Sequence, residues 1–402
     1  MIISRNDMLY AFSFALDCVE NELLGVTSNH SKRVAYICIV LGKKLGFDLN
    51  SLLNLAACAI LHDNALTEYI EEEYSEGNDV VANTGQIRLG THCSMGERNL
   101  RELNFGKDTE GAILYHHENA DGTGPFGKLD NQVSLYARLI HLGDMVDATF
   151  HLDQMTQERY NKVRNYVTEK KGSLFSNDLV DLFLESFTCS KMMEFKTKEI
   201  GSLLNMELPN ISREHSKEEI IGFSTMFARI VDYKSHFTKE HSVGVAKKAV
   251  QMGQYYGYDE EKLIKLYFAG ALHDIGKLAV NTEILEKAGK LTKEEYLHIQ
   301  SHALYTYEIL SKVSGLGEVV GWASYHHEKL NGTGYPFGKT AEELGMEERI
   351  MACIDIYQAL IEKRPYKEGF QQKTVLKMMR ALANKGELDS KIVTDIGIVF
   401  AE

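Results

Sequence analysis

Proline is scarce in this sequence, with only 4 among 402 residues, and runs that alternate apolar and polar residues are hard to find. So few helix breakers favour a largely helical chain. Apolar residues instead recur at helical spacing in residues 30–48 and 241–259, and a glycine, Gly46 or Gly257, stands where each helix should end. The sequence therefore predicts an all-α fold.

Long apolar runs and paired cysteines are also missing. No run reaches the roughly 18 residues that a transmembrane helix needs, and the first residues lack the basic region and apolar core of a signal peptide. The cysteines, which show no CxxC pair, are Cys18, Cys38, Cys58, Cys93, Cys189 and Cys353. We expect a cytoplasmic protein with buried, reduced thiols and no membrane association.

Positive charge is in deficit, since the formal net charge is −13. This balance argues against binding to DNA or RNA polymers and to membrane surfaces. It would also repel an anionic substrate, unless a metal cluster or local basic residues reverse the sign at the site.

The chain contains a long internal repeat. His30 and His241 each begin a His-Ser pair and lie 211 positions apart, and the same distance separates His62 from His273. A solenoid would show a period of about 20–50 residues, so this repeat indicates the duplication of a whole domain.

We therefore predict two tandem domains, residues 1–205 and 212–402. The boundary falls near Pro209. Beyond it, Ser216 followed by Glu219 resembles a capping box, which predicts the first helix of the second domain.

The repeated polar residues are histidines and aspartates. They are His30, His62, Asp63, His92, His116, His117 and Asp144 in the first half, and His241, His273, Asp274, His302, His326, His327 and Asp355 in the second. Imidazole and carboxylate together form a ligand set for divalent transition metals. Because the markers lie far apart in sequence, they must come from different helices that converge inside a bundle.

So many ligands exceed one tetrahedral site and suit two metals that share a carboxylate, for which the adjacent His-Asp pair is the natural candidate. Two metals at roughly 3.5–4 Å can activate water and stabilise an in-line phosphoryl displacement. A single histidine on a helix is more often packed or solvent-facing than a ligand. The repetition of the whole set at near-constant spacing favours metal binding in both halves.

The second half resembles a known family. Its pattern, "HDIGK" followed by "HHEKLNGTGYP" and then "RPYK", is similar to the HD-GYP family of cyclic dinucleotide phosphodiesterases, within the HD superfamily. The likeness covers roughly residues 217–402, and a degraded form covers 5–190. It implies two tandem HD-type helical bundles, with the seven histidines and aspartates of the second half as ligands of two divalent transition metals, iron or manganese.

The resemblance also implies individual roles. Asp274 would bridge the metals, and Lys277 would approach the scissile phosphate and offset developing charge. Tyr335, in the glycine-rich turn, would face the substrate. Arg364 and Lys367 would contact phosphate or guanine, for which the planar fork of arginine is suited.

Two positions depart from the family pattern. Asn331 stands where the family usually has aspartate, and Gln358 stands three residues after the last metal aspartate, where the family favours a carboxylate. Neither is a metal ligand in the implied scheme, so these departures bear on substrate detail rather than on catalysis.

The first half keeps its metal-ligand positions but lacks others. Leu66 replaces the lysine, "GPF" at 124–126 replaces "GYP", and no RPYK follows Asp144. We interpret this half as a regulatory domain that binds metal or nucleotide without turnover. A slow or different phosphohydrolase, or a relic retained for packing, are the alternatives.

The leading hypothesis for the whole chain is hydrolysis of a cyclic dinucleotide, either cyclic di-GMP or 3′,3′-cyclic GMP-AMP. The alternatives are another HD-type nucleotide phosphohydrolase and a binding scaffold without turnover. Residues 5–24 and 217–234 could form a homodimer interface, although core packing is favoured. No carboxylate precedes His241 or His30 by four residues, so we expect a dinuclear centre and a linear dinucleotide as the main product.

Overall fold

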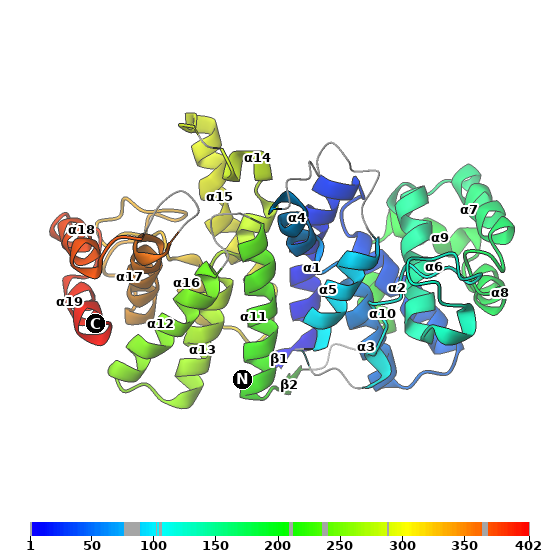
Figure 1. Cartoon of the computed structure of the whole chain (residues 1–402), viewed down its shortest axis with the longest axis horizontal. Helices are drawn as coiled ribbons and strands as arrows, with labels where there is room; N and C mark the ends of the chain where they lie inside the picture. Colours follow the sequence, from blue (N-terminus) through cyan, green and yellow to red (C-terminus); the bar gives the residue numbers. More distant parts are fainter. Residues whose placement is uncertain are drawn as a thin grey trace. The chain divides into compact units, whose positions relative to one another are not determined.

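Helices supply nearly all the regular structure in the residues that the computed structural model describes (Figure 1), which confirms the all-α prediction. The described residues are 2–75, 89–101, 103, 107–208, 212–234, 240–287, 289–363 and 369–401. The chain divides into an N-terminal unit, Arg5–Ile211, and a C-terminal unit, Met1–Ser4 together with Ser212–Glu402.

Ten α-helices in the described part of the N-terminal unit precede the boundary. They are α1 (Arg5–Leu24), α2 (His30–Lys44), α3 (Leu49–Ile60), α4 (Leu66–Ser75), α5 (Leu89–Arg101), α6 (Leu135–Phe150), α7 (Gln157–Glu169), α8 (Asn177–Ser186), α9 (Cys189–Thr197) and α10 (Ile200–Glu207). Short 3₁₀ turns occur at Lys107–Thr109, Asp130–Gln132 and Leu152–Gln154.

The C-terminal unit repeats the central part of this order. Its helices are α11 (Lys217–Tyr233), α12 (His241–Tyr255), α13 (Glu260–Leu272), the 3₁₀ helix η4 (Ile275–Ala279), α14 (Thr282–Leu285), α15 (Lys293–Leu310), α16 (Val319–Ser324), α17 (Met346–Ile361), α18 (Gln372–Asn384) and α19 (Ser390–Val399).

Two short strands were not predicted. β1 (Ile2–Ser4) pairs antiparallel with β2 (Ser212–Glu214), with Ile3 opposite Arg213. Strands of three residues are too short to show an alternating pattern. Because of this pairing the first residues of the chain lie with the C-terminal unit, whereas the sequence analysis had assigned them to the first domain.

Local signals explain where the helices begin and end. Gly46 and Gly257 follow α2 and α12 with φ of 79° and 74°, a left-handed conformation that glycine adopts without strain, as expected for helix ends. The predicted capping box is present at α11, where the Ser216 hydroxyl accepts from the backbone N–H of Glu219 and the Glu219 carboxylate accepts from the backbone N–H of Ser216.

The packing of the two units is also equivalent. In the N-terminal unit α2 packs against α3 and α6, and in the C-terminal unit α12 packs against α13 and α17. Corresponding aspartates, Asp48 and Asp259, cap α3 and α13 by accepting backbone N–H bonds. The sequence repeat is therefore a repeat of three-dimensional structure that brings the same helix ends together twice.

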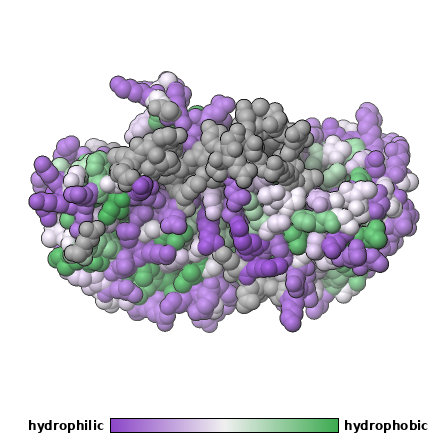
Figure 2. All heavy atoms as spheres, viewed as in Figure 1, coloured by the Kyte–Doolittle hydropathy of each residue, from purple (hydrophilic) through white to green (hydrophobic). Residues whose placement is uncertain are grey.

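The helices at the start of each unit contribute to its own packing. α1 packs on α2 and α3, and α11 packs on α12 and α13, in line with core packing of residues 5–24 and 217–234; a homodimer stays a prediction. Hydrophilic residues predominate on the face of the described surface in Figure 2. Among the described residues, no helix is both long enough and apolar enough to cross a membrane.

None of the six cysteines, all of which lie among the described residues, is in a disulfide. Cys38, Cys58, Cys93 and Cys353 are buried, as expected, whereas Cys18 and Cys189 are partly exposed.

Candidate metal centres

The C-terminal unit brings its seven predicted ligands to one place from five helices or helix ends. His241 is the first residue of α12, His273 and Asp274 follow α13, His302 lies on α15, His326 and His327 follow α16, and Asp355 lies on α17. All are buried except His327, which is partly exposed. We call this set the C-terminal cluster.

The carboxylate of Asp274 stands between two groups of histidines. Its Oδ2 lies 3.1 Å from Nε2 of His273 and 4.0 Å from Nε2 of His241. Its Oδ1 lies 3.4 Å from Nε2 of His302 and 3.8 Å from Nε2 of His326. Each oxygen thus addresses a different pair of nitrogens, which is the arrangement that a carboxylate bridging two cations requires.

Asp355 belongs to the first of these groups. Its Oδ1 lies 3.1 Å from Nε2 of His241 and 3.7 Å from Nε2 of His273. In each of the sets His241–His273–Asp355 and His302–His326–His327, the ligand atoms lie within 4.8 Å of one another. The donor set of nitrogen and oxygen atoms suits divalent transition metals.

Hydrogen bonds to the main chain orient three of these rings. Nδ1 of His273, His302 and His326 contacts the carbonyl oxygens of Gly270, Ile299 and Ala323 at 2.8, 2.6 and 2.7 Å. With Nδ1 as the donor, the lone pair of Nε2 faces the centre of the cluster.

Two buried atoms of the C-terminal cluster have no hydrogen-bond partner, Nε2 of His273 and Oδ1 of Asp274. Leaving buried polar atoms unpaired costs free energy unless another group satisfies them. One cation in each group of ligands would satisfy these two atoms, so the residues fit divalent metals.

The protonation of the rings follows from their surroundings. Burial lowers the pKa of His302 to about 3, so its ring is neutral and able to ligate. Burial also lowers the pKa of His241, but hydrogen bonds to Asp355 and Glu362 outweigh it and raise that pKa to about 9. Without a metal the ring of His241 is therefore protonated at neutral pH, and a cation bound between the ring and Asp355 would displace that proton.

Glu362 was missed by the sequence analysis. Its Oε2 lies 3.1 Å from Nδ1 of His241. In the N-terminal unit the equivalent contact, 2.7 Å to Nδ1 of His30, comes from Asp147, which corresponds to Gln358. Gln358 instead accepts from Nζ of Lys248 at 2.7 Å. Glu362, the residue after the end of α17, thus makes the contact to Nδ1 of His241 that Asp147 makes to Nδ1 of His30.

Two predicted functional side chains border the C-terminal cluster. Nζ of Lys277 donates to Oδ2 of Asp274 at 2.5 Å. The ring of Tyr335 lies 4.7 Å, centroid to centroid, from that of His327. Arg364 and Lys367 lie outside the described residues.

The glutamate after the paired histidines holds the glycine-rich turn. The Glu328 carboxylate accepts backbone N–H bonds from Phe337 at 2.7 Å and Lys339 at 2.9 Å. Within the turn, Asn331 accepts from the N–H and hydroxyl of Thr333 at 3.1 and 2.7 Å. An aspartate would accept the same bonds, so the departure at 331 preserves the turn. The recurrence of "HHE" in both halves could have revealed the role of the glutamate.

The N-terminal unit assembles its seven predicted residues in the same way. Asp63 places Oδ2 3.6 Å from Nε2 of His62, and Oδ1 3.4 and 3.5 Å from Nε2 of His92 and His116. Oδ1 of Asp144 lies 3.2 Å from Nε2 of His30, and Oδ2 lies 3.9 Å from Nδ1 of His117. We call this set the N-terminal cluster.

The N-terminal cluster also has buried atoms without a hydrogen-bond partner, Nε2 of His62 and His116 and Oδ1 of Asp63. Main-chain carbonyls of Ala59 and Ile113 hold Nδ1 of the two rings at 2.9 and 2.6 Å. These residues fit a cation for the same reason as those of the C-terminal cluster.

The border of the N-terminal cluster differs. Leu66, the counterpart of Lys277, is buried and carries no charge. The Glu118 carboxylate still accepts from the backbone N–H groups of Phe126 and Lys128, each at 2.5 Å. Phe126 and Lys128 correspond to Phe337 and Lys339 when the N-terminal turn is aligned with a one-residue gap at Tyr335. The N-terminal turn therefore has no tyrosine at this position but keeps the glutamate that holds it.

Comparisons with known proteins agree across both halves. Residues 18–168 and 225–392, which contain the two clusters, match the family described as HD domain. The chain is 32% identical over 401 residues to the 3′3′-cGAMP-specific phosphodiesterase 1 of Vibrio cholerae serotype O1, covering 97% of this chain and 90% of that protein. It is 30% identical over 344 residues to the 3′3′-cGAMP-specific phosphodiesterase 3 of the same organism, covering 84% of this chain and 73% of that protein.

A crystal structure titled as a cyclic GMP-AMP specific phosphodiesterase of V. cholerae has the same fold. It matches with a TM-score of 0.67 over 99% of this chain and 98% of its own, at 22% sequence identity.

Proposed function

The chain belongs to the HD domain family, in its HD-GYP branch, and from this premise we propose that it is a metal-dependent phosphodiesterase that opens a cyclic dinucleotide at the C-terminal cluster. The observation that carries the proposal is the division of the Asp274 oxygens between two pairs of histidine nitrogens, with Lys277 and Tyr335 beside them. The substrate is cyclic di-GMP or 3′,3′-cyclic GMP-AMP. We favour 3′,3′-cyclic GMP-AMP because the two relatives that align over most of the chain are named as phosphodiesterases specific for it.

In this proposal His241, His273 and Asp355 would hold one divalent metal, His302, His326 and His327 would hold the other, and Asp274 would be shared. Iron or manganese fits the nitrogen and oxygen donors. Such a pair of cations supplies Lewis acidity toward the phosphodiester and lowers the pKa of water.

The chain's own side chains have separate tasks. Asp274, whose pKa is held well below its usual range by the charges of His273 and Lys277 despite burial, stays ionised. Lys277 offsets charge on the phosphate oxygens, and Tyr335 contacts the substrate from the turn that Glu328 fixes. Water adds to one phosphorus, the bond from that phosphorus to a ribose oxygen breaks, a proton of the water ends on that ribose oxygen, and a linear dinucleotide results.

We infer a dinuclear rather than a trinuclear centre. Asp232 accepts from the backbone N–H and hydroxyl of Ser242 at 3.0 and 2.6 Å, and so supports the start of α12. Glu240 is exposed, whereas His241 is buried. Phe237 lies outside the described residues, and the corresponding Val26 is apolar. With two cations, the second cleavage to mononucleotides should be slow.

To test the proposal, the protein is purified without oxygen, its metal content is measured, and its turnover of each cyclic dinucleotide is assayed. We expect iron or manganese in the preparation, conversion of 3′,3′-cyclic GMP-AMP or cyclic di-GMP to the linear dinucleotide, and loss of turnover with a chelator. Metal-loaded protein that binds these compounds without hydrolysing them would favour the scaffold alternative. Rapid appearance of mononucleotides would contradict the dinuclear assignment.

A further inference from the structure

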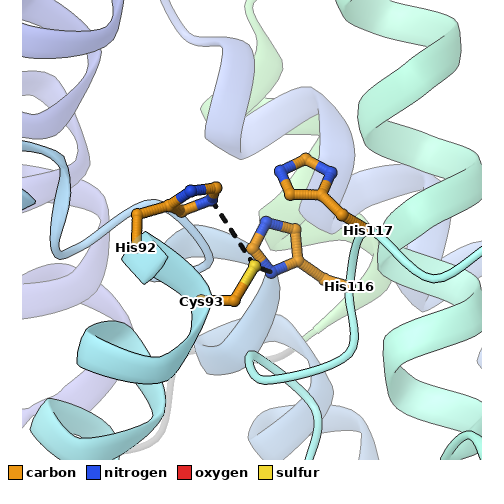
Figure 3. Close-up of side chains that lie close together, drawn as sticks. All are labelled: His92, Cys93, His116 and His117. Atoms are coloured by element: carbon orange, nitrogen blue, oxygen red, sulfur yellow. Dashed lines mark hydrogen bonds between the residues drawn. The ribbon is translucent and has the colours of Figure 1, made fainter. Parts of the chain in front are cut away.

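The N-terminal cluster contains a cysteine that has no counterpart in the C-terminal cluster. Cys93 follows His92 on α5, and its side chain is fully buried. Figure 3 shows its sulfur directed toward the rings of His92 and His116. The corresponding residue after His302 is Ala303, which offers no ligand atom.

The separations around Cys93 are those of ligands that share one small cation. In a tetrahedral site with metal–sulfur bonds of about 2.3 Å and metal–nitrogen bonds of about 2.0–2.1 Å, sulfur and nitrogen lie about 3.5–3.6 Å apart. Sγ of Cys93 lies 3.6 Å from Nε2 of His92 and 3.7 Å from Nδ1 of His116. Oδ1 of Asp63 lies 3.4 Å from Nε2 of His92 and 3.5 Å from Nε2 of His116.

Unpaired atoms independently point to a ligand at this position. Nε2 of His116 and Oδ1 of Asp63 have no hydrogen-bond partner, and these side chains are 0% and 7% exposed. Because Nδ1 of His116 contacts the carbonyl oxygen of Ile113 at 2.6 Å, the lone pair of Nε2 is free to bind a cation. The atoms of His92, Cys93, His116 and His117 lie within 4.8 Å of one another.

We propose that the N-terminal cluster contains a thiolate metal site, in which Cys93 joins His92, His116 and His117 around a divalent cation such as zinc. Thiolate is a softer ligand than imidazole or carboxylate and favours Zn²⁺. The C-terminal cluster offers only nitrogen and oxygen atoms and suits iron or manganese. The duplicated fold thus holds two chemically different centres, and four protein ligands leave the N-terminal cation no open position of the kind that catalytic zinc keeps.

Cobalt substitution tests this proposal independently of turnover. A cysteine thiolate bound to Co²⁺ gives a ligand-to-metal charge-transfer absorption in the near ultraviolet, which histidine and aspartate ligands do not give. We expect the band in the Co²⁺-loaded full-length protein and its loss in Cys93→Ser. Cys58→Ala is the matched control, because Cys58 is also fully buried in the N-terminal unit but belongs to none of the ligand groups; the band should persist there.

An unchanged band in Cys93→Ser would overturn the proposal. If that variant does not fold, X-ray absorption of the zinc-loaded wild-type protein decides the question. A sulfur neighbour at about 2.3 Å from zinc supports the site, because Cys93 is the one cysteine in the ligand groups of the described residues. A shell of nitrogen and oxygen alone contradicts it.

Discussion

Asp274 is the residue on which both proposed cations depend. Its two oxygens face different histidines, so no other side chain of the cluster can replace it. We expect Asp274→Ala to lose metal and turnover together, leaving less than about a tenth of the wild-type rate, because the two-metal activation of water requires both cations. Steady-state turnover and metal content of the same preparation check this. Retention of the wild-type rate would show that Asp274 is not the shared ligand.

Substitution of Glu328 should reduce turnover but leave the metal content of the protein unchanged. Hydrogen bonds to a charged group are worth about 1.5–3 kcal/mol each, and its carboxylate makes two to the turn that carries Tyr335. We expect Glu328→Ala to lower the free energy of unfolding by about 3–6 kcal/mol and to reduce turnover, and Glu328→Gln to have a milder effect. Urea unfolding, metal analysis and turnover of each variant provide the measurements.

Glu118 supplies the matched control, since it makes the same two bonds in the N-terminal unit. Glu118→Ala should reduce stability comparably and leave turnover nearly unchanged. If Glu328→Ala removed metal as well, the glutamate would be part of the metal site and not only the anchor of the turn.

The sequence predicted residues better than it predicted their supporting contacts. The repeated histidines and aspartates recur at near-constant spacing, so the structure brings all fourteen into two clusters as expected. Glu362 escaped detection because it does not occupy the position of Asp147, and only the folded chain places it beside His241. Cys93 escaped because scattered cysteines have no spacing rule to reveal a ligand.

At the scale of elements, the close approach of η4 to α15 fixes the position of His302. A Cβ on Gly276 would lie 2.0 Å from the carbonyl oxygen of His302 and 2.7 Å from the backbone nitrogen of Thr306. In the N-terminal unit the corresponding residue is Ala65, and a glycine, Gly96, stands instead on α5 at the position of Thr306. A Cβ on Gly96 would lie 2.9 Å from a side-chain carbon of Ile113 and 3.2 Å from the side-chain nitrogen of Asn64.

Gly276→Ala should force α15 away from η4. Overpacking costs about 1–3 kcal/mol and more where backbone atoms clash, so we expect a lower melting temperature, weaker metal binding and a large loss of turnover. Gly289→Ala is the control, because nothing lies within 4 Å of its added Cβ. Thermal unfolding with metal analysis distinguishes the two; equal behaviour of both variants would contradict the contact.

Several helix boundaries could be predicted from local sequence signals, whereas the pairing of the two strands could not. The capping residues and the glycines with positive φ act within a few residues, so they are visible in the sequence. The β1–β2 pair joins segments about 210 residues apart through main-chain hydrogen bonds, which no side-chain pattern specifies.

At the scale of the whole molecule, duplication has produced two similar clusters with different borders. The C-terminal cluster has Lys277 and Tyr335 beside it, whereas the N-terminal cluster has Leu66 and a turn without the tyrosine. We therefore propose that turnover takes place in the C-terminal unit and that the N-terminal unit has a binding or regulatory role. The fold alone does not distinguish the two roles, because each cluster has an aspartate, Asp63 or Asp274, whose two oxygens face different histidines.

Matched substitutions in the two units test this division of roles. Lys277→Leu gives the C-terminal cluster the residue that the N-terminal cluster already has, and removing one preorganised charge donor costs about 10²–10³ in rate. Metal content should remain, since Lys277 is not a ligand in the proposed scheme. Asp63→Ala removes from the N-terminal cluster the counterpart of Asp274, and it should change turnover only modestly. Turnover and metal content of both variants are compared under the same conditions. Loss of hydrolysis in Asp63→Ala together with normal hydrolysis in Lys277→Leu would reverse the roles of the two units.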